Sequence, residues 1–359
     1  MIQMDWVFYL VMALLAILSL IAVGTVMLYV ARTVSVKRLK YRRYFSQEGA
    51  FEGQEILLYE ELSNHSLFPM FQICVESYVT SKIRLEGVES NEEIQHFASR
   101  FSIVLPFTRI RRCHKAKCGK RGFYKLETAK VEFAGMDVYL ESEAQLYIYP
   151  KEISLQEENR MNQYLQYSDA SMLPVMEDVF SFAGVREYRN TDAFRRINYK
   201  ATARRGELMV NQFDYMMGRR VMIYVNFQMQ DSYMALERFE EIMERALSYA
   251  SFLFVRAIEQ GNQAGFRANS QMINGDMYVR FPMSGGQLHY VEVLKEMAMI
   301  RPVYGNSFAS VVEMDIREYM TQTECYFITS YVDEAVERNI EVLTRMNNGV
   351  HLVMLGDVL

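Results

Sequence analysis

The run Val221-Met222-Ile223-Tyr224-Val225 decides the fold of the C-terminal part of the chain. Five consecutive apolar residues are typical of a strand that is buried on both faces, as in a parallel sheet. Apolar residues then recur every three to four positions over residues 239–257, and Gly261 follows them. This spacing predicts a long helix with one face toward the core. A buried strand followed by an amphipathic helix indicates an α/β domain.

The same alternation continues to the C-terminus. Residues 287–300 have a helical pattern, and residues 325–329 are a second apolar run. Asp333 stands where it can cap a further helix, and residues 350–355 resemble a last strand. Alternating strands and helices predict a mostly parallel sheet covered by helices, here over residues 216–359.

Upstream of this domain the pattern changes to short strands. Residues 49–150 contain several short runs of β-branched and aromatic residues separated by turn-prone pairs. In one of them Phe71, Ile73 and Val75 alternate with more polar residues, which predicts that all three lie on one face of a strand. The pattern favours a β-sandwich domain over residues 49–150, followed by a connector over residues 151–215.

The chain begins with an apolar segment. Residues 6–30 are 25 consecutive positions without a charge, which as a helix span about 37 Å and exceed the roughly 30 Å of a hydrocarbon core. The first five residues contain no Lys or Arg, unlike a cleaved signal peptide. We therefore expect a permanent transmembrane anchor over residues 1–31.

Basic residues follow this segment in the predicted juxtamembrane linker, residues 32–48. They are Arg32, Lys37, Arg38, Lys40, Arg42 and Arg43. Since cationic flanks stay on the cytoplasmic side, we expect a single-pass protein of the cell membrane with its soluble domains facing the cytoplasm. The cations of residues 32–43 could also bind anionic lipid headgroups, or they could determine topology alone.

Composition excludes several classes of protein. Of 359 residues, 50% are hydrophobic, so the chain is not intrinsically disordered. Four cysteines are too few for a disulfide scaffold, and a pI near 5.7 argues against nucleic-acid binding. The sequence Cys113-His114-x3-Cys118 contains zinc-ligand types, but no second pair follows at zinc-finger spacing.

The sequence contains no phosphate-binding loop, no nucleophile elbow and no His-Glu-x-x-His motif. The five histidines are scattered, with no acidic or metal-ligating partner evident at sequence spacing. An enzymatic activity is therefore not the favoured interpretation.

The densest charged stretch lies at residues 184–206, which contain seven basic residues and only two acidic ones, Glu187 and Asp192. Arginine forks match carboxylates and phosphates, so the segment could bind an acidic partner or a nucleotide. Alternatively, its acidic residues could pair with neighbouring arginines and tie the two domains together. The candidate interaction residues are Arg186, Glu187, Tyr188, Arg189, Asp192, Arg195, Arg196, Lys200 and Arg204.

Within this stretch the order Arg186-Glu187-Tyr188, Asp192, Arg195-Arg196-Ile197, Tyr199-Lys200-Ala201 and Ala203-Arg204 resembles the signature of the Domain of Unknown Function 58 family. Thr191 stands where the family usually has Gly, and Tyr199 where it usually has Trp. The resemblance implies a C-terminal domain like that of von Willebrand factor A. Such domains can hold Mg²⁺ through an Asp-x-Ser-x-Ser motif after the first strand, supplying hard oxygen ligands.

The corresponding positions here are Asn226, Gln228 and Gln230, which lack the carboxylate and the hydroxyls. We therefore expect no metal site of the usual form and no cofactor, with a shifted Mg²⁺ site at Asp231 and Ser232 as the alternative. Family members are associated with MoxR-type AAA+ ATPases. The resemblance thus implies a membrane-anchored adaptor that works with such an ATPase on envelope or membrane-associated clients. The alternatives are a hydrolytic enzyme with an Arg/Asp anion or metal site, and a metal-gated protein-binding domain.

Overall fold

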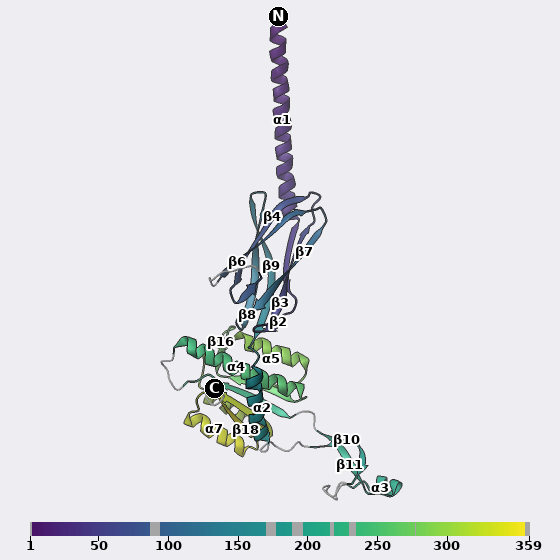
Figure 1. Cartoon of the computed structure of the whole chain (residues 1–359), viewed down its shortest axis with the longest axis vertical. Helices are drawn as coiled ribbons and strands as arrows, with labels where there is room; N and C mark the ends of the chain where they lie inside the picture. The colour runs from purple at the N-terminus through teal and green to yellow at the C-terminus, as the bar shows by residue number, and fades with distance from the viewer. Residues whose placement is uncertain are drawn as a thin grey trace. The chain divides into compact units, whose positions relative to one another are not determined.

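The computed structural model describes residues 2–86, 94–169, 177–188, 197–215, 219–229, 235–276 and 278–355 (Figure 1). The chain divides into two compact units, Met1–Ile148 and Tyr149–Leu359. The first unit contains one helix and a β domain, and the second contains an α/β domain. Each is described by itself.

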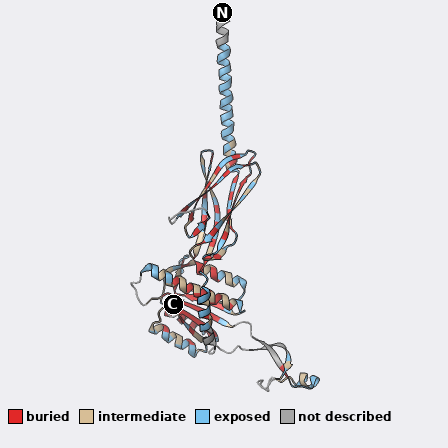
Figure 2. Cartoon of the chain, in the orientation of Figure 1, coloured by how far each residue is buried: buried red, intermediate tan, exposed pale blue. Residues whose placement is uncertain are grey.

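The chain starts with a long apolar helix, α1 (Ile2–Lys37). Its segment Phe8–Lys37 is long and apolar enough to cross a membrane, and the most apolar 18-residue window is not buried by any part of the protein (Figure 2). The helix predicted from residues 6–30 is therefore confirmed as a candidate membrane span.

The β domain consists of two antiparallel sheets. Along the first sheet the strand order is β1 (Leu39–Phe45), β3 (Glu55–Asn64), β7 (Arg109–Cys118) and β5 (Ile83–Leu85). Along the second it is β2 (Gly49–Phe51), β9 (Met136–Tyr149), β8 (Gly122–Phe133), β4 (Met70–Thr80) and β6 (Ile94–Val104). Buried residues from both sheets share the same apolar clusters, so the two sheets enclose a common core.

Two expectations for this unit need correction. Residues 39–45, expected within a linker, form strand β1, which pairs with β3 from Leu39 opposite Asn64 onward. Strand alternation turns Arg43 inward, where it is 1% exposed, so it is not available to lipid headgroups. Phe71 is 55% exposed whereas Ile73 is buried. The reason is Gln72, whose φ of 53° lies in the left-handed region and interrupts the alternation.

The α/β domain is built on a mixed five-stranded sheet. Its strand order is β15 (Val279–Ser284), β13 (Gln263–Ala268), β12 (Arg220–Asn226), β17 (Thr323–Thr329) and β18 (Gly349–Met354). The pairs β12–β13, β12–β17 and β17–β18 are parallel, but the edge strand β15 is antiparallel to β13. The two apolar runs of the sequence are confirmed as the buried central strands β12 and β17.

Helices cover this sheet. They are α4 (Leu236–Glu259), α5 (Gln287–Met299), α6 (Phe308–Arg317) and α7 (Glu334–Arg345). One apolar cluster joins α6 and α7 to the same face of β12 and β17, and α4 and α5 lie on the other side of the sheet (Figure 1). Asp333 caps α7 as predicted, since its carboxylate accepts a 2.8 Å hydrogen bond from the Val336 amide.

The remaining elements are smaller. Helix α2 (Leu155–Asp169) packs on α4, where Arg245 forms a 3.3 Å ion pair with Glu157. Strands β14 (Ser270–Met272) and β16 (Ile300–Tyr304) form one two-stranded sheet. Strands β10 (Glu177–Glu187) and β11 (Met209–Tyr215) form another, with helix α3 (Tyr199–Arg205) between them in sequence.

Candidate functional site

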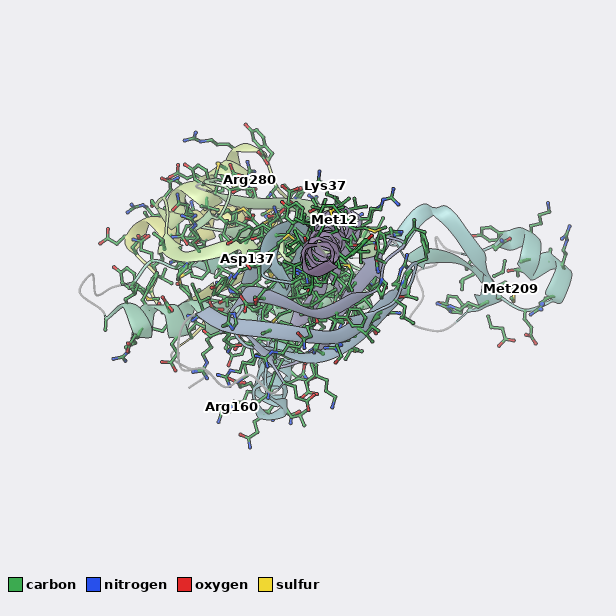
Figure 3. All side chains as sticks on the ribbon, turned by 90° about the horizontal axis from the view of Figure 1, so that it is seen from above. Met12, Lys37, Asp137, Arg160, Met209 and Arg280 are labelled. Atoms are coloured by element: carbon green, nitrogen blue, oxygen red, sulfur yellow. The ribbon has the colours of Figure 1, made fainter. Side chains whose placement is uncertain are left out.

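The described part of the basic segment contains helix α3, which lies between the two strands of a sheet that is separate from the five-stranded sheet. β10 pairs with β11 so that Arg186 lies opposite Val210 and Glu187 opposite Met209. Met209 (labelled in Figure 3) and Val210 are buried. The Tyr188 amide donates a 2.9 Å hydrogen bond to the Leu208 carbonyl, which extends the pairing beyond the strands.

Helix α3 has its own signals for beginning and ending. The Asn198 side chain accepts a 2.9 Å hydrogen bond from the Ala201 amide at the N-terminus. Gly206, at a φ of 78°, ends the helix, and its amide donates to the Thr202 carbonyl. The Thr202 hydroxyl in turn accepts a 3.0 Å hydrogen bond from the Met209 amide, which joins α3 to β11.

The basic side chains of this helix face outward. No residue of α3 is buried, and Tyr199 is 76% exposed. Lys200, Arg204 and Arg205 are all exposed. The candidates Arg189, Asp192, Arg195 and Arg196 lie outside the described residues.

Three polar residues meet at the carboxyl ends of the parallel strands. They are Asn226 at the end of β12, Asn269 just after β13 and Thr329 at the end of β17, and each is at most 2% exposed. Asn226 Nδ2 donates to Thr329 Oγ1 at 3.1 Å and to the Tyr331 carbonyl at 3.0 Å. Asn226 Oδ1 accepts from Asn269 Nδ2 at 3.2 Å.

This position matters because the connections diverge there. From β12 the chain passes through α4 to β13 on one side, whereas β17 lies on the other side of β12. In open α/β sheets, ligands bind in the crevice outside the carboxyl ends at such a switch point. Here the Asn226 amide bridges it.

Gln228 and Asp333 continue the same polar cluster. The backbone N–H of Gln228 donates to Asn226 Oδ1 at 2.9 Å. The side-chain Nε2 of Gln228 donates to Asp333 Oδ2 at 3.2 Å. Asp333 is already engaged as the cap of α7. Gln230, Asp231 and Ser232 lie outside the described residues.

At the position where a metal-binding carboxylate would stand, Asn226 therefore supplies a neutral amide. Both hydrogens of its amide are donated and its oxygen accepts twice, so the oxygen is committed to the protein. Across the described residues, no group of three or more His, Cys, Asp or Glu side chains could hold a metal ion. The described part of the switch point is thus a hydrogen-bonded lattice that closes the ends of the strands.

Sequence reasoning missed Asn269 and Thr329. A signal for them exists, because each directly follows or ends an apolar strand run, and the carboxyl ends of parallel strands lie at one edge. The Cys113-His114-x3-Cys118 motif gives no common site, since Cys113 is exposed and Cys118 is buried in the same strand.

A second cluster, buried under α6, was also not predicted. Asp315 accepts hydrogen bonds from Tyr224 at 2.7 Å and from Arg267 at 3.1 Å, and Arg280 approaches it at 3.2 Å. Burial of the Tyr224 hydroxyl raises its pKa well above its ordinary value, and the neighbouring Cys325 and Asp315 raise it further. The cluster joins α6 to β12, β13 and β15, which is a structural role.

Two histidines lie at hydrogen-bond distance from buried acidic partners that sequence spacing did not reveal. His114 lies 2.8 Å from Glu60 in the β domain, and His351 lies 2.8 Å from Glu324 between β17 and β18. Ser99 also donates to Glu60, at 2.6 Å. In a catalytic triad the histidine would stand between the serine and the acid, whereas here Glu60 is central and buried.

The basic hairpin and the α/β sheet lie in the region that a known family covers. Residues 184–353 match the family described as "Protein of unknown function DUF58". This match confirms the resemblance that the signature at residues 186–204 predicted. No curated protein matches the chain.

Similar solved structures are distant. A CARDB domain of the PF1109 protein from Pyrococcus furiosus is 9% identical, covering 31% of this chain and 93% of that one, with a TM-score of 0.21. A non-cellulosomal cohesin from Archaeoglobus fulgidus is 14% identical, covering 34% and 97%, with a TM-score of 0.22. Neither likeness carries an argument about function at such scores.

Proposed function

We propose that this protein is a membrane-anchored adaptor. Helix α1 would anchor it in the cell membrane as a single pass, with both following domains facing the cytoplasm. The segment 184–206 would dock an AAA+ ATPase of the MoxR type, which acts on envelope or membrane-associated clients. In this proposal the α/β domain is von Willebrand factor A-like, which the strand order with β12 at its centre and an antiparallel edge strand supports.

The observation that carries the proposal is the exposed basic face of α3. Tyr199, Lys200, Arg204 and Arg205 project from a helix with no buried residue, held by its own cap and hairpin. Arginine and tyrosine are the residue types enriched where protein interfaces bind most strongly. The charge of this segment, +5 against −5 for the whole chain, suits an acidic partner surface.

Orientation follows from the cations beside α1. Arg32, Lys37, Arg38, Lys40 and Arg42 are exposed at or just after the end of the helix. Their position favours the cytoplasmic side for the large C-terminal part.

A metal-gated binding domain is the second candidate that the sequence raised. The Asn226 lattice weighs against it, because the position expected to supply a carboxylate supplies an amide already engaged on both atoms. Hydrolysis at an Arg/Asp site would need Asp192 or Asp231, which lie outside the described residues.

The test is affinity purification from crosslinked native membranes, with and without ATP, followed by mass spectrometry. A charge-reversal variant, K200E/R204E/R205E, removes the basic face of α3. A matched variant, R317E/R338E/R345E, makes the same charge change on α6 and α7, where these arginines are exposed.

We expect nucleotide-dependent recovery of an AAA+ ATPase with the wild type and the matched variant, and loss of recovery with the α3 variant. Equal recovery with all three would show that α3 is not the docking site. Absence of any such ATPase in both nucleotide states would overturn the adaptor proposal.

A further inference from the structure

One end of the β domain exposes a cluster of large apolar side chains. They lie in the β3–β4 loop, in the β6–β7 loop and at the adjoining ends of β4 and β6. We call this cluster the apolar rim, and it consists of Leu67, Phe68, Phe71, Ile103, Leu105 and Phe107, which are 41–67% exposed. Contiguous exposed apolar surface of this kind usually marks an interaction site.

The apolar rim lies at the end of the β domain that α1 enters. Arg38, the residue after α1, accepts a 3.1 Å hydrogen bond through its carbonyl from the His65 amide at the start of the β3–β4 loop. In the last turn of α1, Ser35 is 2% exposed and Val36 packs against the core. Helix and rim are therefore joined directly, without a flexible linker.

A buried side chain holds the two loops of the rim together. Asn64 is 1% exposed, and its Nδ2 donates to the carbonyls of Phe68 at 2.8 Å and of Val104 and Leu105 at 3.2 Å. Its Oδ1 accepts from the Ser66 hydroxyl at 2.7 Å. The apolar tips are thus fixed in their outward positions.

Phe107 occupies a backbone conformation that disfavours it. The Thr108 amide donates to the Leu105 carbonyl at 3.3 Å, with Pro106 and Phe107 between them. Phe107 has a φ of 52°, where a turn with Pro at its second position usually has glycine. A bulky residue kept at such a position, and 66% exposed, points to a function for the ring.

The two loops of the rim carry no acidic residue and have cations beside them. Residues 65–71 and 103–109 contain no acidic residue, and Arg109 is exposed beside the second loop. Lys37 (labelled in Figure 3), Arg38 and Lys40 are exposed at the helix end. Apolar and aromatic side chains mixed with cations are typical of surfaces that lie at a membrane interface.

We infer that the apolar rim inserts into the interfacial layer of the bilayer that α1 crosses, and so holds the β domain against the membrane. This inference rests on the proposed anchoring by α1. Lys37 follows Val30 by seven positions, which is about 10 Å of helix. That length is close to the interfacial layer of about 5–8 Å on each side of the hydrocarbon core, which places the rim at headgroup depth.

The full chain, reconstituted in phosphatidylcholine–phosphatidylglycerol vesicles with lipids brominated near the headgroup, tests this by tryptophan quenching. The wild-type chain has one tryptophan, Trp6, which reports on α1 itself. In a W6F background, F107W and L67W place the reporter in the two loops of the rim. Y78W is the matched control, because Tyr78 is 70% exposed on β4 and eight residues, about 26 Å, from the rim end of that strand.

We expect F107W and L67W to lose most of their emission, with the spectrum shifted to the blue, and Y78W to keep its emission. Quenching of Trp6 without quenching of F107W and L67W would overturn the inference while leaving the anchor in place. Unquenched Trp6 would remove the anchor itself. Quenching of Y78W equal to that of F107W would also overturn it, because contact would not be confined to the rim.

Discussion

The hydroxyl of Tyr224, on the central strand β12, donates a 2.7 Å hydrogen bond to Asp315 Oδ2 on helix α6. The same carboxylate binds Arg267 of β13 and Arg280 of β15. The Tyr224 ring also stacks on Phe327 of β17, with ring centroids 4.5 Å apart. One acidic residue therefore links α6 to the central strand and to the antiparallel edge of the sheet.

The variant D315N should destabilise the α/β domain by about 3–5 kcal/mol, because it leaves the buried Arg267 without its counter-ion. The control is E318Q, since Glu318 pairs with the same Arg280 but is 61% exposed, and its loss should cost less than about 1 kcal/mol. Hydrogen exchange with peptide resolution across β12 and β13 measures both effects. Equal protection in the two variants would show that the buried cluster contributes no more than the surface pair.

Glu60 makes the stability of the β domain sensitive to acid. Burial alone would raise the pKa of Glu60, but hydrogen bonds from His114, Ser99 and Tyr41 together lower it below its ordinary value. A carboxylate whose folded pKa is depressed contributes stability above its unfolded pKa, about 4.3, and loses it as pH falls through the folded pKa. The wild-type β domain should therefore lose stability as the pH falls below about 4.3.

The E60Q variant should be less stable than the wild type at pH 7 and show a flatter dependence on pH in the acid range. Urea unfolding at a series of pH values, followed by exchange of β3 and β7 amides, measures this slope. Parallel slopes for the two proteins would mean that Glu60 is not the group responsible. Glu61 offers a control, because its side chain is 15% exposed and faces Arg109 and Arg111 at 3.8 Å on the outer side of the same strand.

The sequence predicted what local pattern determines. The central strands β12 and β17 are contiguous apolar runs, and burial on both faces follows from that pattern alone. The Asp315 cluster could not be predicted, because its members are 35 to 91 residues from Asp315 in sequence and meet only through the sheet.

Arg43 shows a second kind of limit. From sequence alone, a cation near a membrane segment is expected at the surface. The Arg43 guanidinium instead lies in the β-domain core, where it donates at 3.1 Å to the carbonyls of Thr128 and Ser142. Its inward direction depends on the register of β1 against β3, which sequence composition does not contain. Within the candidate site, the sequence predicted the basic charge of α3 but not its exposure, and the Asn226–Asn269 contact could not be predicted without the parallel sheet.

Gly349 is required by the buried pair His351–Glu324. A methyl group at Gly349 would overlap the Glu324 carboxylate, which is 3% exposed and 2.8 Å from His351. G349A should therefore displace Glu324 from His351 and cost about 1–3 kcal/mol. G285A is the control, since its nearest neighbour would be 3.6 Å away, and it should unfold with the wild type. A G349A variant as stable as G285A would show that Glu324 can move without loss.

Asn226 gives the test that separates the lattice from a metal site. In N226D a carboxylate oxygen replaces the amide nitrogen that donates to Thr329 and to the Tyr331 carbonyl. Two donors are lost and an anion faces a carbonyl oxygen, so the α/β domain should lose about 1–3 kcal/mol. Calorimetric unfolding with and without Mg²⁺ measures this loss of stability. We expect the same loss in both, because the described partners of residue 226 are two amides and the Thr329 hydroxyl, which is hydrogen-bonded to the Tyr331 carbonyl. None of these groups is a carboxylate. Recovery of stability in N226D on adding Mg²⁺ would instead mean that residue 226 alone separates this chain from a metal-binding site, and that the metal-gated function should be preferred for its relatives.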